Sequence, residues 1–457
     1  MGNFTYYSPE KLGQILEKEQ NVYFIGIGGV SMSSLAEISY KAGYKTAGSD
    51  RTLSAITASL QAEGITVHEG HDAKNCEGYT VFVYNAAIHE DNPEYKYAQD
   101  NGFYLIRRAD YLGYAATFYK ISIGVAGTHG KSTSTAMLGE ALTAAGLDPA
   151  VLNGAVMPKY GSPYKRGKKD CICFEACEYT DSFLSFFPTV AVVLNAEFDH
   201  ADYFKTRERY VGSFKKYISQ SPSAVVNIDS HGAKKAAEGY TGKLLTCAVR
   251  QSADVTAANI VMTDSFAGFD VMYKGSVYMH LSLSVGGMHN VYNALCCAAV
   301  CIMIGADPEK AAEGISSFTG VARRFEYKLT YNGADIFDDY AHHPDEIKAT
   351  LSVARQRVKG RLYVAFQPHT YTRTRDFYGD FVKSFTDCDE VIFCDIYAAR
   401  ETDTLGMSAQ KLAEDVPNGT YKGGFDEVAA YLKSVLKKGD GAVIMGAGDI
   451  VKIFSRF

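Results

Sequence analysis

The sequence lacks an uninterrupted apolar run long enough to span a membrane, and its first twenty residues are charged rather than apolar. We therefore expect no membrane segment and no secretory signal, and we predict a cytoplasmic protein. Its ten cysteines include no Cys-x-x-Cys pair and no paired metal-ligand spacing. We interpret them as buried structural thiols of a reducing compartment.

An excess of positive charge is also absent, because the net charge is −6 and no basic cluster is interleaved with aromatic residues. This charge balance excludes binding to a nucleic-acid backbone as the main role. Internal repeats, low-complexity tracts and long linkers are missing as well. A chain of 457 residues with 47% hydrophobic residues is an ordinary globular protein of two to four domains.

Strand and helix patterns alternate along three segments, which predicts an α/β fold with three domains. Residues 1–117 are expected to form a Rossmann-like domain. Residues 118–321 are expected to form a central P-loop-type ATPase domain, with a parallel sheet and a small antiparallel sheet where residues 255–285 alternate between apolar and polar. Residues 322–457 are expected to form a second Rossmann-like domain.

A glycine-rich stretch at 124–133 follows a β-branched run and precedes a helical pattern over residues 134–145. The backbone N–H groups of such a turn lie at the positive N-terminal end of the helix and point outward, where a phosphate can bind them. Lys131 adds a point charge there, and the Ser132 hydroxyl is placed to ligate magnesium. Because Val125 stands where the strict phosphate-loop pattern has glycine, this is a shorter variant with Gly127-x-x-Gly130-Lys131-Ser132.

A second glycine loop, Gly26-x-Gly28-x-x-Ser31, follows the first strand pattern, with Asp50 near the place of a ribose-binding acid. The third glycine of a dinucleotide fingerprint is missing. NAD binding is therefore an open alternative, and another phosphate-bearing ligand is favoured.

Acidic residues follow two strand patterns of the central segment. Glu175 and Glu178 end one strand, and the stretch 195–200, which includes His200, follows another. The carboxyl ends of parallel strands face the ligand crevice, so these acids predict a Mg²⁺ site beside the phosphate loop. From the residue type alone, His200 is an unusual ligand for so hard an ion.

Histidines and acids gather after strand patterns of the last segment, at 338–346 and at 367–375. Adjacent histidines beside adjacent acids favour a functional site, and His369 and Arg373 suit recognition of a carboxylate. Asn290 and Asn293 fall on one helical face, where they could contact a base or cap the helix.

Taken in order, these motifs resemble the Mur ligase family of ATP-dependent amide-forming enzymes, and the likeness spans nearly the whole chain. The stretches that carry it are Gly26-Ile-Gly-Gly29, Asp91-Asn-Pro-Glu94, Ile106-Arg-Arg-Ala109, Gly127-Thr-His-Gly-Lys131, Asp338-Asp-Tyr-Ala-His-His-Pro344 and Phe366-Gln-Pro-His369. The sequence departs from the usual family pattern at Ser31, Asn85, Ser132, Cys177 and Thr370.

The resemblance implies a ligase that joins L-alanine to the carboxylate of UDP-N-acetylmuramate through an acyl phosphate, with ATP and Mg²⁺. The residues implied to bind ATP are Gly127, Thr128, His129, Gly130, Lys131, Ser132, Thr133, Asn290, Asn293, Arg324 and Asp339. Those implied to bind the sugar nucleotide or the amino acid are Gly28, Gly29, Asp50, Arg107, His342, His369 and Arg373. The implied metal ligands are Ser132, Glu175 and His200, and the implied catalytic residues are Lys131, Glu175, His200 and His343.

Three alternatives remain open at this point. A recycling ligase would add a peptide to the same sugar nucleotide and differ in the pocket of the third domain. An NAD-dependent oxidoreductase would use the loop at Gly26 to Asp50 but would leave the phosphate loop unexplained. A nucleotide-gated regulatory module would not need His342, His343 and Arg373 at strand ends. The expected assembly is a monomer or a homodimer.

Overall fold

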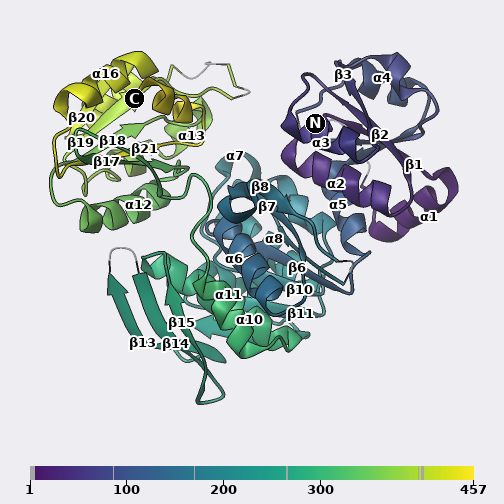
Figure 1. The fold of residues 1–457 in the computed structure, drawn as a ribbon, viewed down its shortest axis with the longest axis horizontal. Helices are drawn as coiled ribbons and strands as arrows, with labels where there is room; N and C mark the ends of the chain where they lie inside the picture. The colour runs from purple at the N-terminus through teal and green to yellow at the C-terminus, as the bar shows by residue number, and fades with distance from the viewer. Residues whose placement is uncertain (1–5, 86, 169, 264–265, 400, 403–405) are drawn as a thin grey trace. The chain divides into compact units, whose positions relative to one another are not determined.

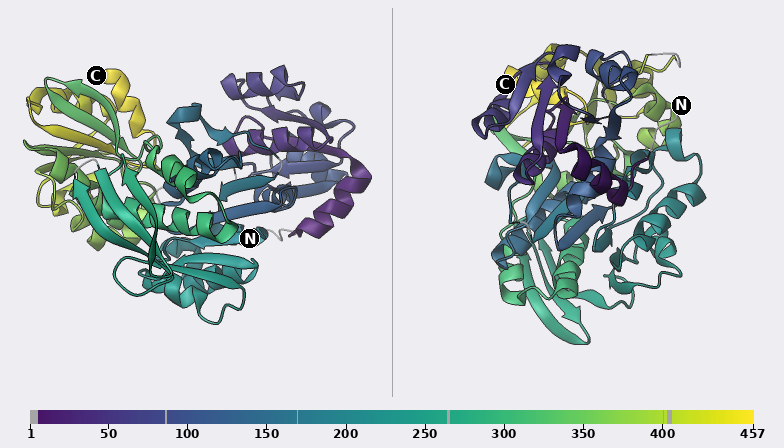
Figure 2. Two further views of the ribbon diagram at one scale, coloured as in Figure 1. Left: turned by 60° about the horizontal axis from the view of Figure 1, so that its bottom comes forward. Right: turned by 90° about the vertical axis from the view of Figure 1, so that its right-hand side faces the viewer.

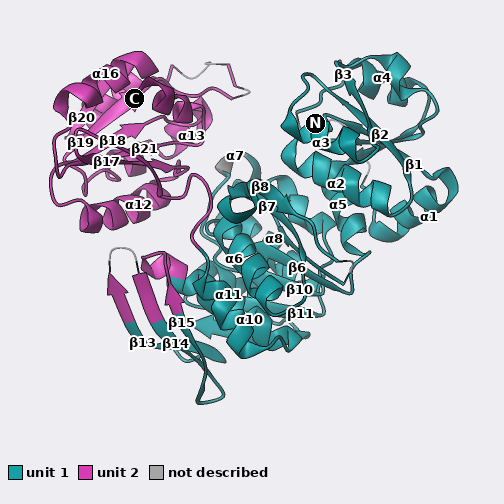
Figure 3. Ribbon diagram, viewed as in Figure 1, with its two compact units in different colours: residues 1–260, 269–281, 291–318 teal, residues 261–268, 282–290, 319–457 magenta. Residues whose placement is uncertain are grey.

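A computed structural model describes residues 6–457 except 86, 169, 264–265, 400 and 403–405. The chain forms an α/β fold around three sheets (Figure 1). It divides into two compact units (Figure 3): unit 1 contains residues 1–260, 269–281 and 291–318, and unit 2 contains residues 261–268, 282–290 and 319–457. The predicted α/β class is confirmed, and the boundaries near residues 117 and 322 stay predictions.

The first sheet belongs to unit 1 and is parallel, with the order β3-β2-β1-β4-β5. Its strands are β1 (Asn21–Ile25), β2 (Lys45–Asp50), β3 (Thr66–Glu69), β4 (Val81–Tyr84) and β5 (Tyr104–Arg107). The helical segments are α1 (Pro9–Glu19), α2 (Val30–Lys41), α3 (Ala55–Ala62), η1 (Ala73–Cys76), α4 (Pro93–Asp100) and α5 (Arg108–Ala116). The strand order reverses between β1 and β4, so the loop after β1 lies where open α/β sheets bind ligands.

Side-chain caps fix where several of these helices begin. Ser54 and Thr57 form a capping box at α3, and Asn92 accepts the N–H groups of Glu94 and Tyr95 at α4, with Pro93 in the first turn. Such caps satisfy backbone donors that the helix itself leaves free. These caps are local signals that lie within a few residues of each helix start.

The central sheet has the order β15-β14-β13-β12-β11-β10-β6-β9-β7-β8. Its strands are β6 (Ile121–Ala126), β7 (Ala150–Met157), β8 (Ser162–Lys165), β9 (Cys171–Glu175), β10 (Val190–Val193), β11 (Ser223–Asn227), β12 (Lys243–Ala248), β13 (Val255–Thr263), β14 (Phe266–Tyr273) and β15 (Ser276–Leu283). The helical segments are α6 (Lys131–Ala144), η2 (Pro158–Tyr160), η3 (Tyr179–Ser185), α7 (Ala201–Phe204), α8 (Arg207–Ser219), α9 (His231–Ala237), α10 (Met288–Ile304) and α11 (Pro308–Ser316).

The alternating stretch over 255–285 forms β13, β14 and β15 at one edge of this sheet (Figures 1 and 2). Lys274 and Gly275, between β14 and β15, both have positive φ, as a tight hairpin turn requires. Because β13 pairs in parallel with β12, this part continues the parallel sheet and does not form a separate one.

The third sheet lies in unit 2 with the order β16-β17-β21-β18-β19-β20, and only its edge pair β16–β17 is antiparallel among the described pairings. Its strands are β16 (Glu326–Tyr331), β17 (Ala334–Asp339), β18 (Leu362–Phe366), β19 (Glu390–Cys394), β20 (Gly419–Gly423) and β21 (Gly441–Met445). The helical segments are α12 (Pro344–Arg357), α13 (Tyr371–Asp376), α14 (Tyr378–Val382), α15 (Ala409–Asp415), α16 (Phe425–Val435) and η4 (Ile450–Arg456).

Alternate residues of β18 face opposite sides of this sheet, as the period of a strand requires. Phe366 packs in the core that contains Leu351 of α12, whereas Tyr363 packs in the core that contains Leu432 of α16. Helices therefore cover both faces (Figure 1), which explains why β18 is apolar throughout.

All ten cysteines are free, and nine of them are buried, as the sequence interpretation expected for structural thiols. Within the described residues, none of the helices combines the length and the apolar character that a membrane span needs.

Candidate functional site

The phosphate loop leaves the buried strand β6 and enters α6 at Lys131, three residues before the start that the sequence pattern predicts. Gly130 caps the helix with a φ of +83°. A Cβ added there would lie 2.6 Å from Asn293 Oδ1, so both backbone conformation and space favour glycine. The loop therefore presents backbone N–H groups at the positive end of a 14-residue helix.

The segment after β10 holds this loop in place. Asn195 accepts the N–H of His129 at 2.9 Å and donates to its carbonyl at 3.1 Å. Thr128 donates through its hydroxyl to the Glu197 carbonyl at 2.7 Å and lies 2.8 Å from the Tyr210 hydroxyl. These contacts bring the two predicted motifs, at 124–133 and 195–200, to the same edge of the central sheet.

Lys131 points back across the loop rather than into solvent. Its Nζ donates to the carbonyls of Gly127 at 2.5 Å and Thr128 at 3.1 Å, and it lies 3.0 Å from Glu178 Oε2. Burial is the largest single effect and disfavours the charged form, but the charge and hydrogen bond of Glu178, together with Cys177 and Glu175, raise the pKa of Lys131 overall. The ammonium is therefore held charged beside the loop.

Glu178 is one of the acids that the sequence predicts beside the phosphate loop, although the family resemblance implies it neither as a metal ligand nor as a catalytic residue. Its side chain is 1% exposed and lies between Lys131 and His200, whose Nε2 is 3.6 Å from Glu178 Oε1. Burial opposes the charge of this carboxylate, yet Lys131 and His200 together lower its pKa. A signal was present, since Glu178 ends the same strand motif as Glu175, but it did not say which acid turns toward the lysine.

The three predicted metal ligands lie around the loop with different surroundings. Glu175 ends β9 and accepts the Gly154 N–H at 2.5 Å. Ser132 lies in the first turn of α6 and is nearly buried. His200 has a φ of +54°, and its ring centroid is 4.5 Å from that of Tyr179. Their roles as ligands stay predictions.

The first glycine loop is closed by an acid from the neighbouring strand. The N–H groups of Gly26 and Ile27 donate to the Ser49 carbonyl at 2.8 Å. Gly28 donates its N–H to Asp50 Oδ2 at 2.9 Å, and a Cβ on Gly28 would lie 2.8 Å from the same oxygen. Gly29 is the N-cap of α2, where no side chain makes a capping hydrogen bond. Gly28, Gly29 and Asp50 thus meet at one end of the sheet.

Arg107 ends β5 and is the N-cap residue of α5. It forms a two-pronged ion pair with the buried Asp110, through Nε at 3.1 Å and Nη2 at 2.8 Å. Ser185 of η3 donates to the same carboxylate at 2.6 Å. The Arg107 side chain is 33% exposed. The observed contacts orient the arginine, and its role toward a substrate stays a prediction.

In unit 2, the predicted nucleotide residues Arg324 and Asp339 surround Tyr340. Asp339 accepts the N–H groups of Phe325 and Ala341, each at 2.7 Å. Burial raises its pKa to about 6, against the opposing charge of Arg324. Arg324 lies over the Tyr340 ring at 5.5 Å and 3.6 Å from Glu346.

The histidines at 342 and 369 lie in one row of rings. The centroid of His369 is 5.7 Å from that of His342 and 5.7 Å from that of Tyr397. Burial, together with the positive charge of Arg373, lowers the pKa of His369 to about 4. His369 is therefore neutral near pH 7. Unit 2 brings His342, His369 and Arg373 close together, three of the four residues predicted to meet an amino acid.

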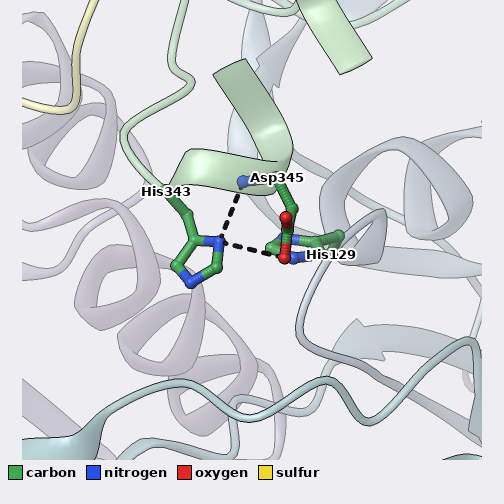
Figure 4. A group of neighbouring side chains, drawn as sticks. All are labelled: His129, His343 and Asp345. Carbon is green, nitrogen blue, oxygen red and sulfur yellow. Dashed lines mark hydrogen bonds and ion pairs between the residues drawn. The ribbon is translucent and has the colours of Figure 1, made fainter. Parts of the chain in front are cut away.

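His343 has the contacts of a helix cap. Figure 4 shows its ring at the start of α12, where Nδ1 accepts the Asp345 N–H at 3.3 Å. Glu346 completes the capping box, and the His343 ring packs 4.8 Å from that of Phe377. These contacts explain why this histidine is buried, and its predicted catalytic role stays a prediction.

The two predicted asparagines lie in the first turns of α10 and are nearly buried. Asn293 faces the phosphate loop within unit 1, as its distance from Gly130 indicates. Asn290, in unit 2, donates to the Gly286 carbonyl at 2.8 Å.

Comparisons with known proteins agree along the chain. Residues 21–120 match the model described as the Mur ligase family catalytic domain, 125–301 the Mur ligase middle domain, and 323–448 the Mur ligase glutamate ligase domain. The chain is 40% identical over 450 residues to the UDP-N-acetylmuramate–L-alanine ligase of Caldanaerobacter subterraneus subsp. tengcongensis, covering 97% of this chain and 98% of that protein. It is 39% identical over 446 residues to the enzyme of the same name from Clostridium acetobutylicum, covering 96% and 97%.

Solved structures are similar over the same length. The UDP-N-acetylmuramate–alanine ligase MurC of Thermotoga maritima matches with a TM-score of 0.79 and 26% identity, covering 96% of this chain and 98% of that one. A murein peptide ligase of Psychrobacter arcticus shares the fold, with a TM-score of 0.68, 24% identity and coverage of 95% and 97%. The ordered motifs, the sheets that position them and these full-length matches lead to one conclusion: the chain belongs to the Mur ligase family.

Proposed function

We propose that this chain is an ATP-dependent ligase that joins L-alanine to the carboxylate of UDP-N-acetylmuramate, a step of peptidoglycan precursor synthesis. The observation that carries the proposal is the full-length identity of about 40% to ligases of that name. Mur ligases use ATP, and the loop from Gly127 to Ser132 has the backbone that a nucleoside triphosphate requires.

Amide formation needs an activated carboxylate, because a carboxylate itself is a poor electrophile. In the proposed reaction a carboxylate oxygen attacks the γ-phosphorus of ATP and ADP leaves, which gives an acyl phosphate. The amine of L-alanine then attacks the acyl carbon, and the tetrahedral intermediate expels phosphate. Lys131, held charged beside the loop, is the group we assign to offset the negative charge of the transferring phosphoryl.

The residues beside Lys131 fit a magnesium ion. Glu178 and Glu175 offer carboxylate oxygens, and Ser132 offers a hydroxyl, all of which are hard donors. Glu178 Oε2 is buried and forms an ion pair with Lys131, but it accepts no hydrogen bond from a described residue. When bound, Mg²⁺ would neutralise charge on the phosphates. We assign these three residues, with His200 beside Glu178, to hold it.

The first sheet supplies a site that suits a sugar nucleotide. Gly28 and Gly29 lie at the uncapped start of α2, where a diphosphate would meet backbone N–H groups. Asp50 stands at the end of the next strand, the place of a ribose-binding acid in such sheets. We assign Arg107, whose side chain is partly exposed, to the same ligand.

Unit 2 supplies groups that suit an amino acid and a nucleotide. Arg373 suits the carboxylate of L-alanine, and the neutral ring of His369 suits its amine, because an unprotonated imidazole can accept a proton from the attacking nitrogen. We assign Asn290, Arg324 and Asp339 of unit 2 to the nucleotide, as we do Asn293 in unit 1. The proposal places the enzyme in the cytoplasm, where its ATP is made, as a monomer or homodimer with domains at 1–117, 118–321 and 322–457.

The test is phosphate release by the purified full chain with Mg-ATP, UDP-N-acetylmuramate and one amine at a time. We expect release with L-alanine, slower release with glycine or L-serine, and none without UDP-N-acetylmuramate. Release with an L-alanyl peptide in place of L-alanine would make the chain a recycling ligase. No release with any amine would overturn the proposal, and oxidation of NADH would point to an oxidoreductase.

A further inference from the structure

Glu94 is a fully buried carboxylate of the domain that contains the first sheet. It lies in the first turn of α4, and its side chain is 0% exposed. Oε1 accepts from the Tyr23 hydroxyl at 2.9 Å and from the Asp72 N–H at 3.4 Å. Oε2 accepts a short hydrogen bond from Ser49 and lies 2.9 Å from Nδ1 of His71. Hydrogen bonds therefore satisfy both oxygens of this buried carboxylate.

This network determines which nitrogen of His71 carries the proton. Nδ1 of His71 lies 2.9 Å from both Glu94 Oε2 and Ser49 Oγ. The carboxylate can only accept, and the Ser49 hydroxyl already donates its hydrogen to Glu94, so its oxygen can only accept as well. Nδ1 must therefore be the donor, and in the neutral ring Nε2 carries a lone pair.

Nε2 of His71 is the atom of this network that is available to contact a ligand. The side chain of His71 is 18% exposed, and in the described part of the chain no group hydrogen-bonds to Nε2. An atom with a lone pair repels phosphate oxygens and attracts a hydrogen-bond donor.

His71 stands beside the loop that we assign to the sugar nucleotide. It follows Gly70, whose N–H donates to the Asp50 carbonyl at 2.7 Å, while the Asp50 carboxylate holds Gly28. It also follows β3, which is next to β2 on the side away from β1. Since the acid at the end of β2 is the ribose position of such sheets, His71 lies toward the nucleoside and away from the diphosphate.

We propose that His71 is a specificity residue for the nucleoside part of the sugar nucleotide, and that Glu94 is the positioning residue that fixes its tautomer. Nε2 accepts a hydrogen bond from a donor of uridine, either a ribose hydroxyl or the imide N–H of the base. This inference rests on the proposed function, because it needs a uridine nucleotide at the first sheet. It adds two residues, His71 and Glu94, that the site predictions did not contain.

The test measures binding of UDP, 2′-deoxy-UDP and CDP to the full chain by calorimetry, with ADP as the ligand of the phosphate loop. We expect His71→Phe to weaken UDP binding about 10-fold, the value of one hydrogen bond to a buried partner, and to leave ADP binding unchanged. His68→Phe, a change in the same strand segment, is the matched control and should leave both affinities within twofold. If the donor is the 2′-hydroxyl, wild type discriminates against 2′-deoxy-UDP and the variant does not. If the donor is the imide N–H of uracil, the wild type binds UDP more tightly than CDP, and the His71→Phe variant does not discriminate between them.

The tautomer of His71 can be measured directly by NMR, without an activity assay. In ¹⁵N-histidine spectra of the wild type, the His71 signals should show a protonated Nδ1 and an unprotonated Nε2. Glu94→Gln, whose amide can donate to Nδ1, should shift this signature toward Nε2–H and weaken UDP binding. A wild-type signal of the Nε2–H form, or a His71→Phe variant that binds UDP as tightly as wild type, would overturn the inference. A wild type that binds no uridine nucleotide would instead overturn the proposed function.

Discussion

Among single residues, Glu178 and Lys131 form the most consequential pair of the site. The sequence predicts that acids stand beside the loop, because Glu175 and Glu178 follow the same buried strand. It does not predict which of them meets the lysine. That depends on the backbone after Glu178, where Thr180 and Asp181 both adopt positive φ and turn the chain, a conformation with no glycine to announce it.

Replacing Glu178 with glutamine should leave the Lys131 ammonium without its counter-ion. We expect Glu178→Gln to lower the free energy of unfolding by about 2 kcal/mol or more, since removing one partner of a buried pair leaves an uncompensated charge. It should also slow phosphate release at least 100-fold. Denaturant unfolding and steady-state kinetics measure the two effects.

Glu175→Gln is the matched control for this change. Glu175 accepts a backbone N–H and is not paired directly with the lysine, so its stability loss should be smaller. Equal losses for the two variants would contradict the assignment of Glu178 as the partner of Lys131.

The pKa of His369 predicts a pH dependence of stability. Its pKa is about 4 in the folded chain, below its ordinary value of 6.5, so the unfolded chain binds the proton more readily. This contribution is fully present above pH 6.5 and is lost as the pH falls from about 6.5 to 4. Over that range it amounts to at most about 3 kcal/mol.

The measurement compares urea unfolding of wild type and His369→Gln between pH 4 and 7. His289, whose pKa is also about 4, contributes in the same direction, and Asp339, raised to about 6, contributes in the opposite one. The difference between wild type and variant therefore isolates His369. A difference that does not change with pH would show that His369 is solvated like an ordinary histidine.

At the scale of elements, the parts of the fold with local signals are the ones that a sequence predicts best. The phosphate loop is locally encoded by its glycines, and Asn92-Pro93 is a cap that can be read in the sequence. Long-range pairing was not readable. The sequence does not predict that β13 pairs in parallel with β12, a pairing that joins β13, β14 and β15 to the central sheet. Strand pairing depends on partners far along the chain.

His343 is the N-cap residue of α12, and two substitutions distinguish this structural role from a catalytic one. We expect His343→Ala to destabilise the chain by about 1–2 kcal/mol, because it removes a cap and a ring packed on Phe377. His343→Asn restores a capping side chain and should recover part of that loss. If both variants lose turnover although the asparagine variant is nearly as stable as wild type, His343 acts in catalysis. If activity follows stability, the histidine is a cap.

The loop before α6 depends on a glycine at its last position. Gly130→Ala places a Cβ 2.6 Å from Asn293 Oδ1 at a φ of +83°. We expect it to weaken ADP binding at least 10-fold and to lower the free energy of unfolding by about 1 kcal/mol or more. Gly146→Ala is the control for backbone strain alone, since Gly146 also has positive φ but nothing lies within 4 Å of its added Cβ. Equal ADP affinity in the two variants would contradict a tight loop.

For the whole molecule, three sheets carry three kinds of group: a glycine loop with an acid, a phosphate loop with a lysine and acids, and a cluster of histidines with an arginine. This division matches a reaction with a sugar nucleotide, ATP and an amino acid. The choice of L-alanine was not readable from residue types, because His369 and Arg373 suit the amine and carboxylate of any amino acid. It rests on the relatives that the whole chain matches.

The central claim is that the loop activates a carboxylate and does not simply hydrolyse ATP. The most direct test uses UDP-N-acetylmuramate labelled with ¹⁸O in its carboxylate, together with Mg-ATP, L-alanine and the purified chain. An acyl phosphate passes one carboxylate oxygen to phosphate when the amine displaces it, so mass spectrometry should find one ¹⁸O in each phosphate released. Phosphate without the label, formed at the same rate, would contradict the account.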